Sequence, residues 1–354
     1  MKNLASILII GVLVAGCGEA RLDQPGLHSG SLGGSKYAIA APKEWNGDLL
    51  MLAHGLRSEE ESLVAEVDVE EPLYRGLLAD GWLIASTSYR RNGPIIRDAG
   101  DDIDALRRHV QRIYGPAKRT FLLGWSMGGA ICTMLAETRR DDYDGAVAVG
   151  AALQVHDREN PYRLNYRPQI PLLFLTNRSE LSGPTIYVRH ASKAASPPAL
   201  WIVKRDGHVN VNDPEQRAAL DAIVGYAETG KIARKKDGTV PMGNQPSVAH
   251  FRDGKAHANV TGTSESFGNI YSQFVQHDLT ALGIAEGSDF TVGMGDASFN
   301  IRLAKTYSDV PRGEWVAFIR ADGKLQVARN YANASETLGC KAGDEIYIAP
   351  LPAK

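Results

Sequence analysis

The stretch Thr120-Phe121-Leu122-Leu123-Gly124-Trp125-Ser126-Met127-Gly128-Gly129 decides the fold class of this 354-residue chain. The apolar run at 120–123 predicts a buried strand, and Ala130–Glu137 continues with a helical pattern. Between them stands Gly-x-Ser-x-Gly, whose small residues let a sharp turn lift the Ser126 hydroxyl above a sheet. The amide of Met127, at the start of the helix, then faces a developing oxyanion. The stretch therefore predicts a nucleophilic serine at the carboxyl edge of a sheet.

Apolar runs alternate with helical patterns on both sides of this stretch. Further strands are predicted at 49–53, 82–87, 145–149, 172–175 and 200–203, and helices at 101–114 and 214–227. Near-continuous apolar runs are typical of strands buried on both faces, as in a parallel sheet. We therefore expect an α/β fold with a doubly wound, mostly parallel sheet and right-handed crossovers. Ligands of such sheets bind beyond the carboxyl ends of the strands.

Two other predicted strands are followed by candidate residues of the same site. His54-Gly55-Leu56 follows the run at 49–53, and Asp206-Gly207-His208 comes shortly after the run at 200–203. A histidine past a late strand can reach the serine as a general base. The order serine, acid, histidine requires a carboxylate between Ser126 and His208. Glu180 is the best candidate, and Asp206 is an alternative that also fits a role in shaping the turn.

Residues 35–231 resemble the α/β-hydrolase superfamily. The resemblance is carried by His54-Gly55, Gly124–Gly128 and Asp206-Gly207-His208, which follow one another along the chain in the order of that family. The resemblance implies Ser126 as nucleophile, His208 as base and Glu180 as acid. It also implies an oxyanion hole formed by the amides of Met127 and Leu56. No metal and no organic cofactor is expected. The segment 153–168 is short and polar, which predicts a small lid and an open site.

The N-terminus has the features of a secretory signal. A positive start precedes the apolar run Leu4–Ala15, which ends in Leu13-Val14-Ala15-Gly16-Cys17. This ending resembles the bacterial lipobox, and the resemblance implies a signal peptide at 1–16 and a lipidated Cys17. Residues 17–34 read as a flexible tether. We expect a lipid-anchored, extracytoplasmic protein of a bacterial membrane, on the outer membrane or periplasmic face in a Gram-negative cell.

Charge and cysteine content exclude several classes of protein. The chain has 39 Lys and Arg against 41 Asp and Glu, so no bulk basic field favours nucleic acid as a partner. Cys17, Cys132 and Cys340 are too few and too scattered for a disulfide scaffold or a zinc cluster.

Arg90 and Arg91 follow a predicted strand. They fit either an anionic substrate group or a structural pairing with carboxylates.

The last third of the chain changes pattern. Residues 232–255 read as a linker, and 256–354 as a small all-β domain with strands at 301–304, 314–319, 325–328 and 345–349. Asp322-Gly323 predicts a hairpin turn within it.

A second resemblance covers about residues 256–350. Glu265-Ser266-Phe267-Gly268-Asn269, 306–314, 322–328, 333–339 and 343–345 resemble the C-terminal domain of the S-adenosylmethionine hydroxide adenosyltransferase family. The resemblance implies ligand contacts at Phe267 and Asn269. Ala321 stands where the family has serine, and the family's N-terminal domain, with its half of the nucleoside site, is absent. Adenosyl transfer is therefore not expected.

These observations favour a lipid-anchored serine hydrolase that cleaves carboxylic esters through an acyl-enzyme. Two alternatives stay open at the level of the sequence. One is a serine peptidase of the same fold, because the nucleophile turn is shared. The other is a non-catalytic surface protein that binds a nucleoside-like ligand through its C-terminal domain. The expected partners are a small ester or peptide substrate and, through Cys17, the membrane.

Overall fold

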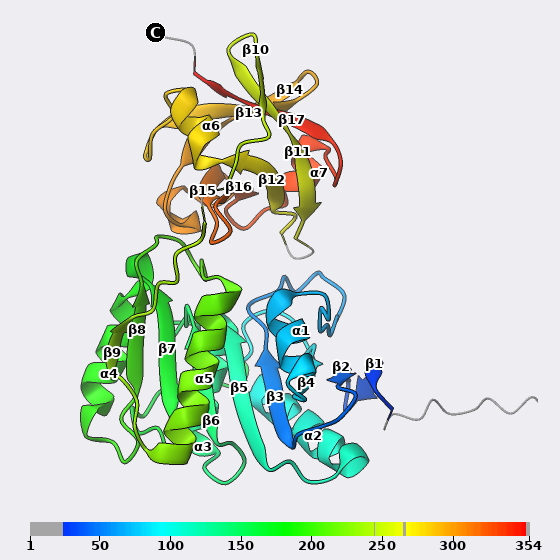
Figure 1. The fold of residues 1–354 in the computed structure, drawn as a ribbon, viewed down its shortest axis with the longest axis vertical. Helices are drawn as coiled ribbons and strands as arrows, with labels where there is room; N and C mark the ends of the chain where they lie inside the picture. The colour runs from blue at the N-terminus through cyan, green and yellow to red at the C-terminus, as the bar shows by residue number, and fades with distance from the viewer. Residues whose placement is uncertain (1–23, 244, 265–266, 352–354) are drawn as a thin grey trace, which may run out of the picture.

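The computed structural model describes residues 24–243, 245–264 and 267–351, which are organised around two sheets (Figure 1). The signal peptide predicted at 1–16 and the lipidation site Cys17 lie outside these residues. The first sheet has the strand order β1-β2-β4-β3-β5-β6-β7-β8-β9. In chain order its strands are β1 (Gly26–Leu32), β2 (Ser35–Ala41), β3 (Asp48–Ala53), β4 (Leu83–Thr87), β5 (Arg119–Trp125), β6 (Gly145–Val149), β7 (Leu172–Asn177), β8 (Ala199–Val203) and β9 (Lys235–Asp237).

Helices cover both faces of this sheet. They are α1 (Pro72–Ala79), α2 (Arg97–Tyr114), α3 (Met127–Thr138), α4 (Ser182–His190) and α5 (Asp213–Thr229). In β3, Leu49 and Met51 join the core formed with α2 and α3, whereas Leu50 and Leu52 join the core formed with α1 and α5. Because both faces are buried, the strand reads as an unbroken apolar run. The pairings from β4 to β9 are parallel, and β1 and β2 pair antiparallel, which confirms the predicted mostly parallel α/β fold.

Two segments predicted as irregular contain strands. Part of the expected tether, 26–32, pairs along its whole length with β2, and the expected linker at 232–255 contains β9 and β10 (His250–Arg252). These are strands at the ends of their sheets, with mostly exposed side chains. Backbone hydrogen bonds hold such strands without any apolar run, so their sequences look like loops.

The C-terminal part forms a closed barrel. Its sheet has the order β10-β11-β12-β16-β15-β14-β13-β17, and an additional pairing of β11 with β17 closes it. The strands are β11 (Lys255–Thr263), β12 (Ile270–Val275), β13 (Asp289–Met294), β14 (Ala297–Leu303), β15 (Trp315–Ile319), β16 (Lys324–Arg329) and β17 (Glu345–Pro350), with helices α6 (Gln276–Ala281) and α7 (Ala334–Leu338). This architecture confirms the predicted small all-β domain.

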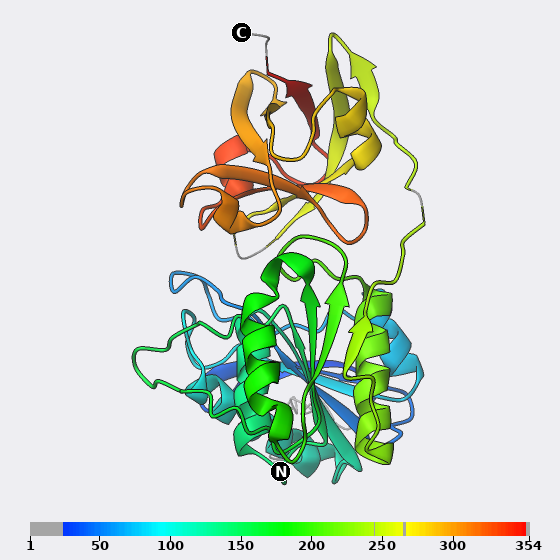
Figure 2. The ribbon, with the colours of Figure 1, turned by 90° about the vertical axis from the view of Figure 1, so that its left-hand side faces the viewer.

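The barrel stands over the carboxyl ends of β7 and β8, the edge where the predicted site lies (Figures 1 and 2). The chain reaches it from β9 by an extended segment that runs along one side of the molecule (Figure 2). None of the helices in the described part of the chain has the length and apolar composition needed to cross a membrane.

A half-buried pair of carboxyl groups joins α1 to α5 and generates a prediction about stability. Glu71, the N-cap of α1, shares a hydrogen bond with Asp213, and burial followed by the charges of Asp213 and Asp68 raises the pKa of Glu71 from 4.5 to about 7. Between these values the folded protein binds more protons than the unfolded chain, so this group's contribution to stability falls as pH rises from about 4.5 through about 7. We expect Glu71→Gln to increase the free energy of unfolding, relative to wild type, more at pH 8 than at pH 4.5. Urea unfolding at both values measures this, and an equal change at both would contradict the assignment.

Candidate active site

Ser126 occupies a strained turn between β5 and α3. Its backbone angles are φ 55° and ψ −117°, and non-glycine residues rarely adopt a positive φ. Such strain costs about 1–3 kcal/mol and persists where neighbouring contacts hold it. Here the Ser126 amide donates to the Val149 carbonyl over 2.9 Å, and the Ala152 amide donates to the Ser126 carbonyl over 3.0 Å. The turn lifts the serine side chain above the sheet edge, as its sequence predicts.

Glycines let the turn pack backbone against backbone. A Cβ atom added to Gly124 would lie 2.4 Å from the Gly128 carbonyl oxygen, and one added to Gly128 would lie 1.9 Å from the Ala53 carbonyl oxygen. Any side chain at either position would therefore force the start of α3 away from β3 or β5. The two glycines fix the distance between Ser126 and the loop that follows β3.

The structure brings Ser126, His208 and Glu180 together. The Nε2 atom of His208 lies 2.8 Å from the Ser126 Oγ, and its Nδ1 atom lies 2.5 Å from the Glu180 Oε2. Because an ionised carboxylate only accepts hydrogen bonds, Nδ1 carries the proton and Nε2 is left to accept the serine hydroxyl. The His208 side chain remains 34% exposed, so a substrate can reach it from solvent.

Glu180 is held by the loop that carries His208. It belongs to a short 3₁₀ turn, Arg178–Glu180, directly after β7. One carboxylate oxygen accepts the Val209 amide over 3.1 Å, while the other faces His208. Gly150 leaves room for it, because an added Cβ there would lie 2.9 Å from the Glu180 Oε1. Both carboxylate oxygens are therefore fixed in direction.

Asp206, the alternative acid, lies elsewhere. Its carboxylate accepts two hydrogen bonds from Arg178, at 2.8 and 2.5 Å, and these bonds hold its pKa below the usual value. Its backbone carbonyl accepts the Asn210 side chain over 2.7 Å. Asp206 thus shapes the turn around His208, and the acid that contacts the imidazole is Glu180.

The loop after β3 passes beside the serine. A Cβ added to Gly55 would lie 3.4 Å from the Ser126 Cβ, so the backbone that leads to Leu56 passes next to the serine. His54 is buried and stacks on Tyr89 at 4.0 Å, and its Nδ1 lies 2.7 Å from the Gly55 carbonyl oxygen. Burial, and then the charge of Arg57, lower the pKa of His54 to about 4, so it stays neutral. His54 has an architectural role, because it fixes this loop.

Met127 completes the set of residues predicted around the serine. It is the first residue of α3 and is buried. The amides of the first turn of a helix have no partner within the helix and lie at its positive end. The Met127 amide is therefore available to an oxyanion formed at Ser126.

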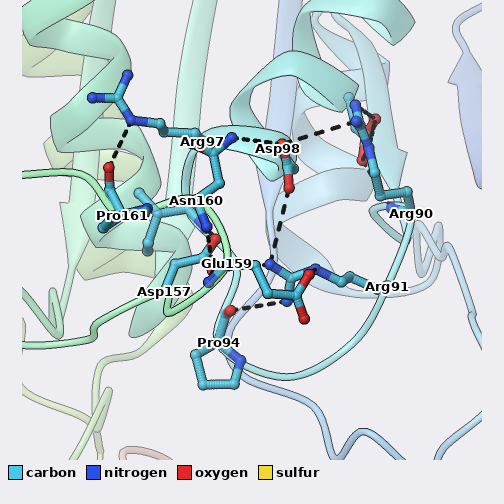
Figure 3. A network of polar contacts seen from close by, with 11 residues as sticks. Arg90, Arg91, Pro94, Arg97, Asp98, Asp157, Glu159, Asn160 and Pro161 are labelled. Carbon is cyan, nitrogen blue, oxygen red and sulfur yellow. Dashed lines mark hydrogen bonds and ion pairs between the residues drawn. The ribbon is translucent and has the colours of Figure 1, made fainter.

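The arginines after β4 tie the segment 153–168 to the start of α2 (Figure 3). Arg90 binds Asp102, with Nη2 and Oδ1 2.6 Å apart. Arg91 binds the buried Asp157 over 2.9 Å and lies 3.9 Å from Asp98. Both guanidinium groups are engaged by carboxylates, which favours the structural interpretation of the two residues.

In the barrel, Phe267 and Asn269 lie just before β12. Phe267 packs edge-to-face on Tyr331, with the ring centres 6.2 Å apart. The Asn269 Nδ2 donates to the Tyr307 hydroxyl over 3.0 Å, and in the described structure its buried Oδ1 has no hydrogen-bond partner. Their role in ligand binding stays a prediction.

Two asparagines that hold the site are not predicted by the sequence patterns described above. The side chain of Asn177, at the end of β7, accepts the Asn210 amide and donates to the Asn210 carbonyl, both over 2.8 Å. The two residues are separated by 33 positions, so no local pattern reveals the pair. A polar residue at the end of an otherwise apolar strand is the signal that could have drawn attention to Asn177.

Comparison with known proteins divides the chain into the same two parts as the two sheets do. Residues 86–222 match the family described as serine aminopeptidase, S33, and residues 265–347 match the C-terminal domain of SAM hydroxide adenosyltransferase. No curated protein matches the chain.

Three solved structures illustrate the similarities. An uncharacterized conserved protein of Thermotoga maritima is 23% identical over 36% of this chain and 48% of its own, with a TM-score of 0.27. Dipeptidyl peptidase 4 of Porphyromonas gingivalis is 15% identical over 50% of this chain and 31% of its own, with a TM-score of 0.40. FphF, a fluorophosphonate-binding serine hydrolase of Staphylococcus aureus, is 16% identical over 57% of this chain and 99% of its own, with a TM-score of 0.42. The chain spans about half or less of the first two proteins.

The sheet, the arrangement around Ser126 and the similarity of residues 86–222 to the serine aminopeptidase family are typical of serine hydrolases with the α/β-hydrolase fold. The chain joins this N-terminal domain, named the hydrolase domain after its fold, to a closed barrel that is similar to the C-terminal domain of SAM hydroxide adenosyltransferase.

The close contact at Gly128 generates a prediction about catalysis. In Gly128→Ala the new methyl group would overlap the Ala53 carbonyl and separate the Met127 amide from the Leu56 amide. Loss of one oxyanion donor lowers kcat by about 10²- to 10³-fold, and we expect at least that effect on ester hydrolysis. Gly225→Ala is the control, because an added Cβ at this position in α5 meets nothing within 4 Å. Wild-type kcat in a folded Gly128→Ala protein would contradict the role of this contact.

Proposed function

We propose that this protein hydrolyses carboxylic esters through an acyl-enzyme formed on Ser126. The proposal is carried by one observation, the hydrogen-bonded chain from the Ser126 hydroxyl through His208 to Glu180. A serine hydroxyl is a weak nucleophile on its own and is activated by an adjacent base that a third group orients. Here the base and the orienting group are both within hydrogen-bond distance.

The reaction follows from this arrangement. Ser126 Oγ attacks the ester carbonyl carbon while its proton passes to His208 Nε2, and the Met127 and Leu56 amides stabilise the oxyanion. The intermediate collapses, and the leaving alcohol takes the proton from His208. Water then attacks the acyl-enzyme and gives its proton to His208. As this second intermediate collapses, His208 returns the proton to Ser126 Oγ, and the carboxylic acid is released. Glu180 stays ionised and stabilises the imidazolium in both steps.

Ester hydrolysis is the least demanding chemistry for this site. An alkoxide or phenoxide leaves more readily than an amine, which must be protonated as it departs. Ester cleavage therefore depends less than peptide cleavage on protonation of the leaving group by His208. The side chains of His208 and Glu180 are partly exposed, which is compatible with small substrates that need no deep tunnel.

Peptide hydrolysis is the second candidate, and the match of residues 86–222 to the serine aminopeptidase family favours it. The same triad performs both reactions, and they differ in how the substrate is positioned. Comparing kcat/KM for short p-nitrophenyl esters and for aminoacyl p-nitroanilides separates the two. A higher value for the anilides would make the protein a peptidase.

The role of the triad generates a direct prediction. Ser126→Ala is expected to lower kcat for p-nitrophenyl acetate by about 10⁴- to 10⁶-fold and to abolish labelling by a fluorophosphonate probe. Glu180→Gln keeps a similar shape but no longer holds the imidazole in the required tautomer, so kcat falls by about 10⁴-fold. Soluble protein starting at residue 18 is suitable for these assays. Full turnover by Ser126→Ala would remove Ser126 from the mechanism.

We also propose that the protein is attached to the extracytoplasmic face of a bacterial membrane through lipid on Cys17. The proposal is supported by the positive start, the apolar run and the Leu13-Val14-Ala15-Gly16-Cys17 ending. Each buried CH₂ of an acyl chain contributes about 0.8 kcal/mol, and several chains on one residue give stable attachment.

The anchor generates its own prediction. In a bacterial host, the full chain is expected in the membrane fraction and in the detergent phase of a Triton X-114 partition. Cys17→Ala has no thiol to carry lipid, so it is expected to keep the uncleaved signal peptide and to show no added acyl mass on its N-terminal peptide. Mass spectrometry of the wild-type N-terminus gives the mass of the attached chains, and an unmodified Cys17 in a membrane-bound protein would contradict the anchor.

A further inference from the structure

The barrel contacts the hydrolase domain beside His208. The Asn210 Nδ2 donates to the carbonyl oxygen of Ile319, at the end of β15, over 2.8 Å. Lys305, which follows β14 closely, pairs with Asp206 over 3.8 Å. Asn210 and Asp206 each lie two positions from His208, on opposite sides of it. The barrel therefore contacts the turn that carries the proposed base, at the edge shown in Figures 1 and 2.

The domain junction is not packed continuously next to this turn. A cavity of about 490 Å³ lies between the domains and is lined by Arg178 and Asp206 on one side and by Lys305 and Arg320 on the other. Since the space beside the turn is open, the described polar links to Asn210 and Asp206 are important for the junction at this point.

The turn depends on Asn210 for its shape. Besides the bond to the barrel, the same amide nitrogen donates to the Asp206 carbonyl over 2.7 Å and closes the turn around His208. Its two N–H groups are thus divided between the turn and the barrel. Gly207 has φ 131° and an added Cβ there would lie 2.5 Å from the Asn210 Cβ, so the asparagine folds tightly over the turn. Val209 also has a positive φ, of 54°, which a free turn would not keep.

The backbone of Asn210 is held by side chains at the end of β7 and just after β8. Its amide and carbonyl both bind the Asn177 side chain, and its carbonyl also accepts the Arg205 Nη1 over 2.6 Å. The side chain is almost completely buried. Asn210 therefore connects three parts of the molecule: the end of β7, the turn at His208 and the barrel.

We propose that Asn210 is a positioning residue for His208, and that the barrel, by accepting one of its N–H groups, is a supporting part of the hydrolase site. The inference rests on the roles proposed above for Ser126 and His208. Proton transfer depends on the 2.8 Å separation of His208 Nε2 and Ser126 Oγ, and a misplacement of about 1 Å can lower a rate about 100-fold. A barrel that holds the turn therefore contributes to kcat without supplying a group to the substrate.

Asn210→Ala tests the positioning role. We expect kcat for p-nitrophenyl acetate to fall 10- to 100-fold with less than a threefold change in KM, and fluorophosphonate labelling of Ser126 to slow by the same factor. Hydrogen exchange of residues 205–211, followed by mass spectrometry, is expected to become at least tenfold faster. Asn46→Ala is the matched control, because Asn46 also bridges two backbone groups, of Asp80 and Asp48, but lies just before the amino end of β3. Unchanged kcat together with unchanged exchange in Asn210→Ala would overturn the proposal.

A barrel-core variant of the full chain tests the contribution of the barrel. Phe290, on β13, is fully buried in the barrel core, so Phe290→Ala is expected to open the barrel at a lower temperature than the hydrolase domain. At a temperature where barrel strands exchange freely and β5 remains protected, we expect turnover to fall at least tenfold and residues 205–211 to lose protection. Phe251→Ala removes the same side chain from a half-exposed position on β10 and serves as control. Retained turnover and loop protection with an open barrel would overturn the barrel's role.

The two experiments separate this proposal from the proposed function. If Ser126→Ala and wild type hydrolyse the ester equally, the catalytic assignment has failed. Exchange of residues 205–211 still reports whether Asn210 and the barrel hold the turn, because that measurement needs no substrate.

Discussion

The close approach of α3 to the end of β3 at Gly128 is the constraint on which the rest of the site depends. No side chain fits there, since an added Cβ would lie 1.9 Å from the Ala53 carbonyl oxygen. Ser126 and Met127 lie just before Gly128 in the chain, and Gly55 and Leu56 lie just after the end of β3. One backbone contact therefore sets the distance between the nucleophile and both proposed oxyanion donors. It also explains why the turn tolerates the positive φ of Ser126, because the elements on either side cannot move apart.

Glu180 and His208, the proposed acid and base, are held by a different kind of contact. The loops after β7 and β8 are joined by side-chain bonds to backbone, from Asn177 to residue 210 and from Ser179 to Gly207. Glu180 adds a bond to the Val209 amide, so the carboxylate both orients His208 and fastens its loop. Such bonds are directional and short, so they fix the imidazole within the narrow range that proton transfer requires.

Sequence reasoning predicts the features that are encoded locally. The apolar runs predict the central strands because those strands are buried on both faces, and the glycine and serine spacing predicts the turn at Ser126. The strands β1, β9 and β10 have mostly exposed side chains, and only backbone pairing reveals them. Arg178 binds Asp206, and Glu180 is the carboxylate that contacts His208. Each of these pairs joins residues that are 28 positions apart. A pattern read along the chain contains no information on such a choice, because it is made by the packing of two loops.

The three triad residues differ in how firmly the hydrolase domain alone supports them. Ser126 sits between a buried strand and a helix, and Glu180 follows β7 directly on a 3₁₀ turn. His208 lies on an irregular turn that includes positive φ angles at Gly207 and Val209. Backbone of this kind has no repeating hydrogen bonds to stabilise it and is more easily displaced than a strand or helix end. The polar links from the barrel described above fall on this turn, at Asp206 and Asn210. A second domain can therefore influence catalysis by supporting the least regular part of the triad, even though every group that the substrate meets in the proposed mechanism comes from the first.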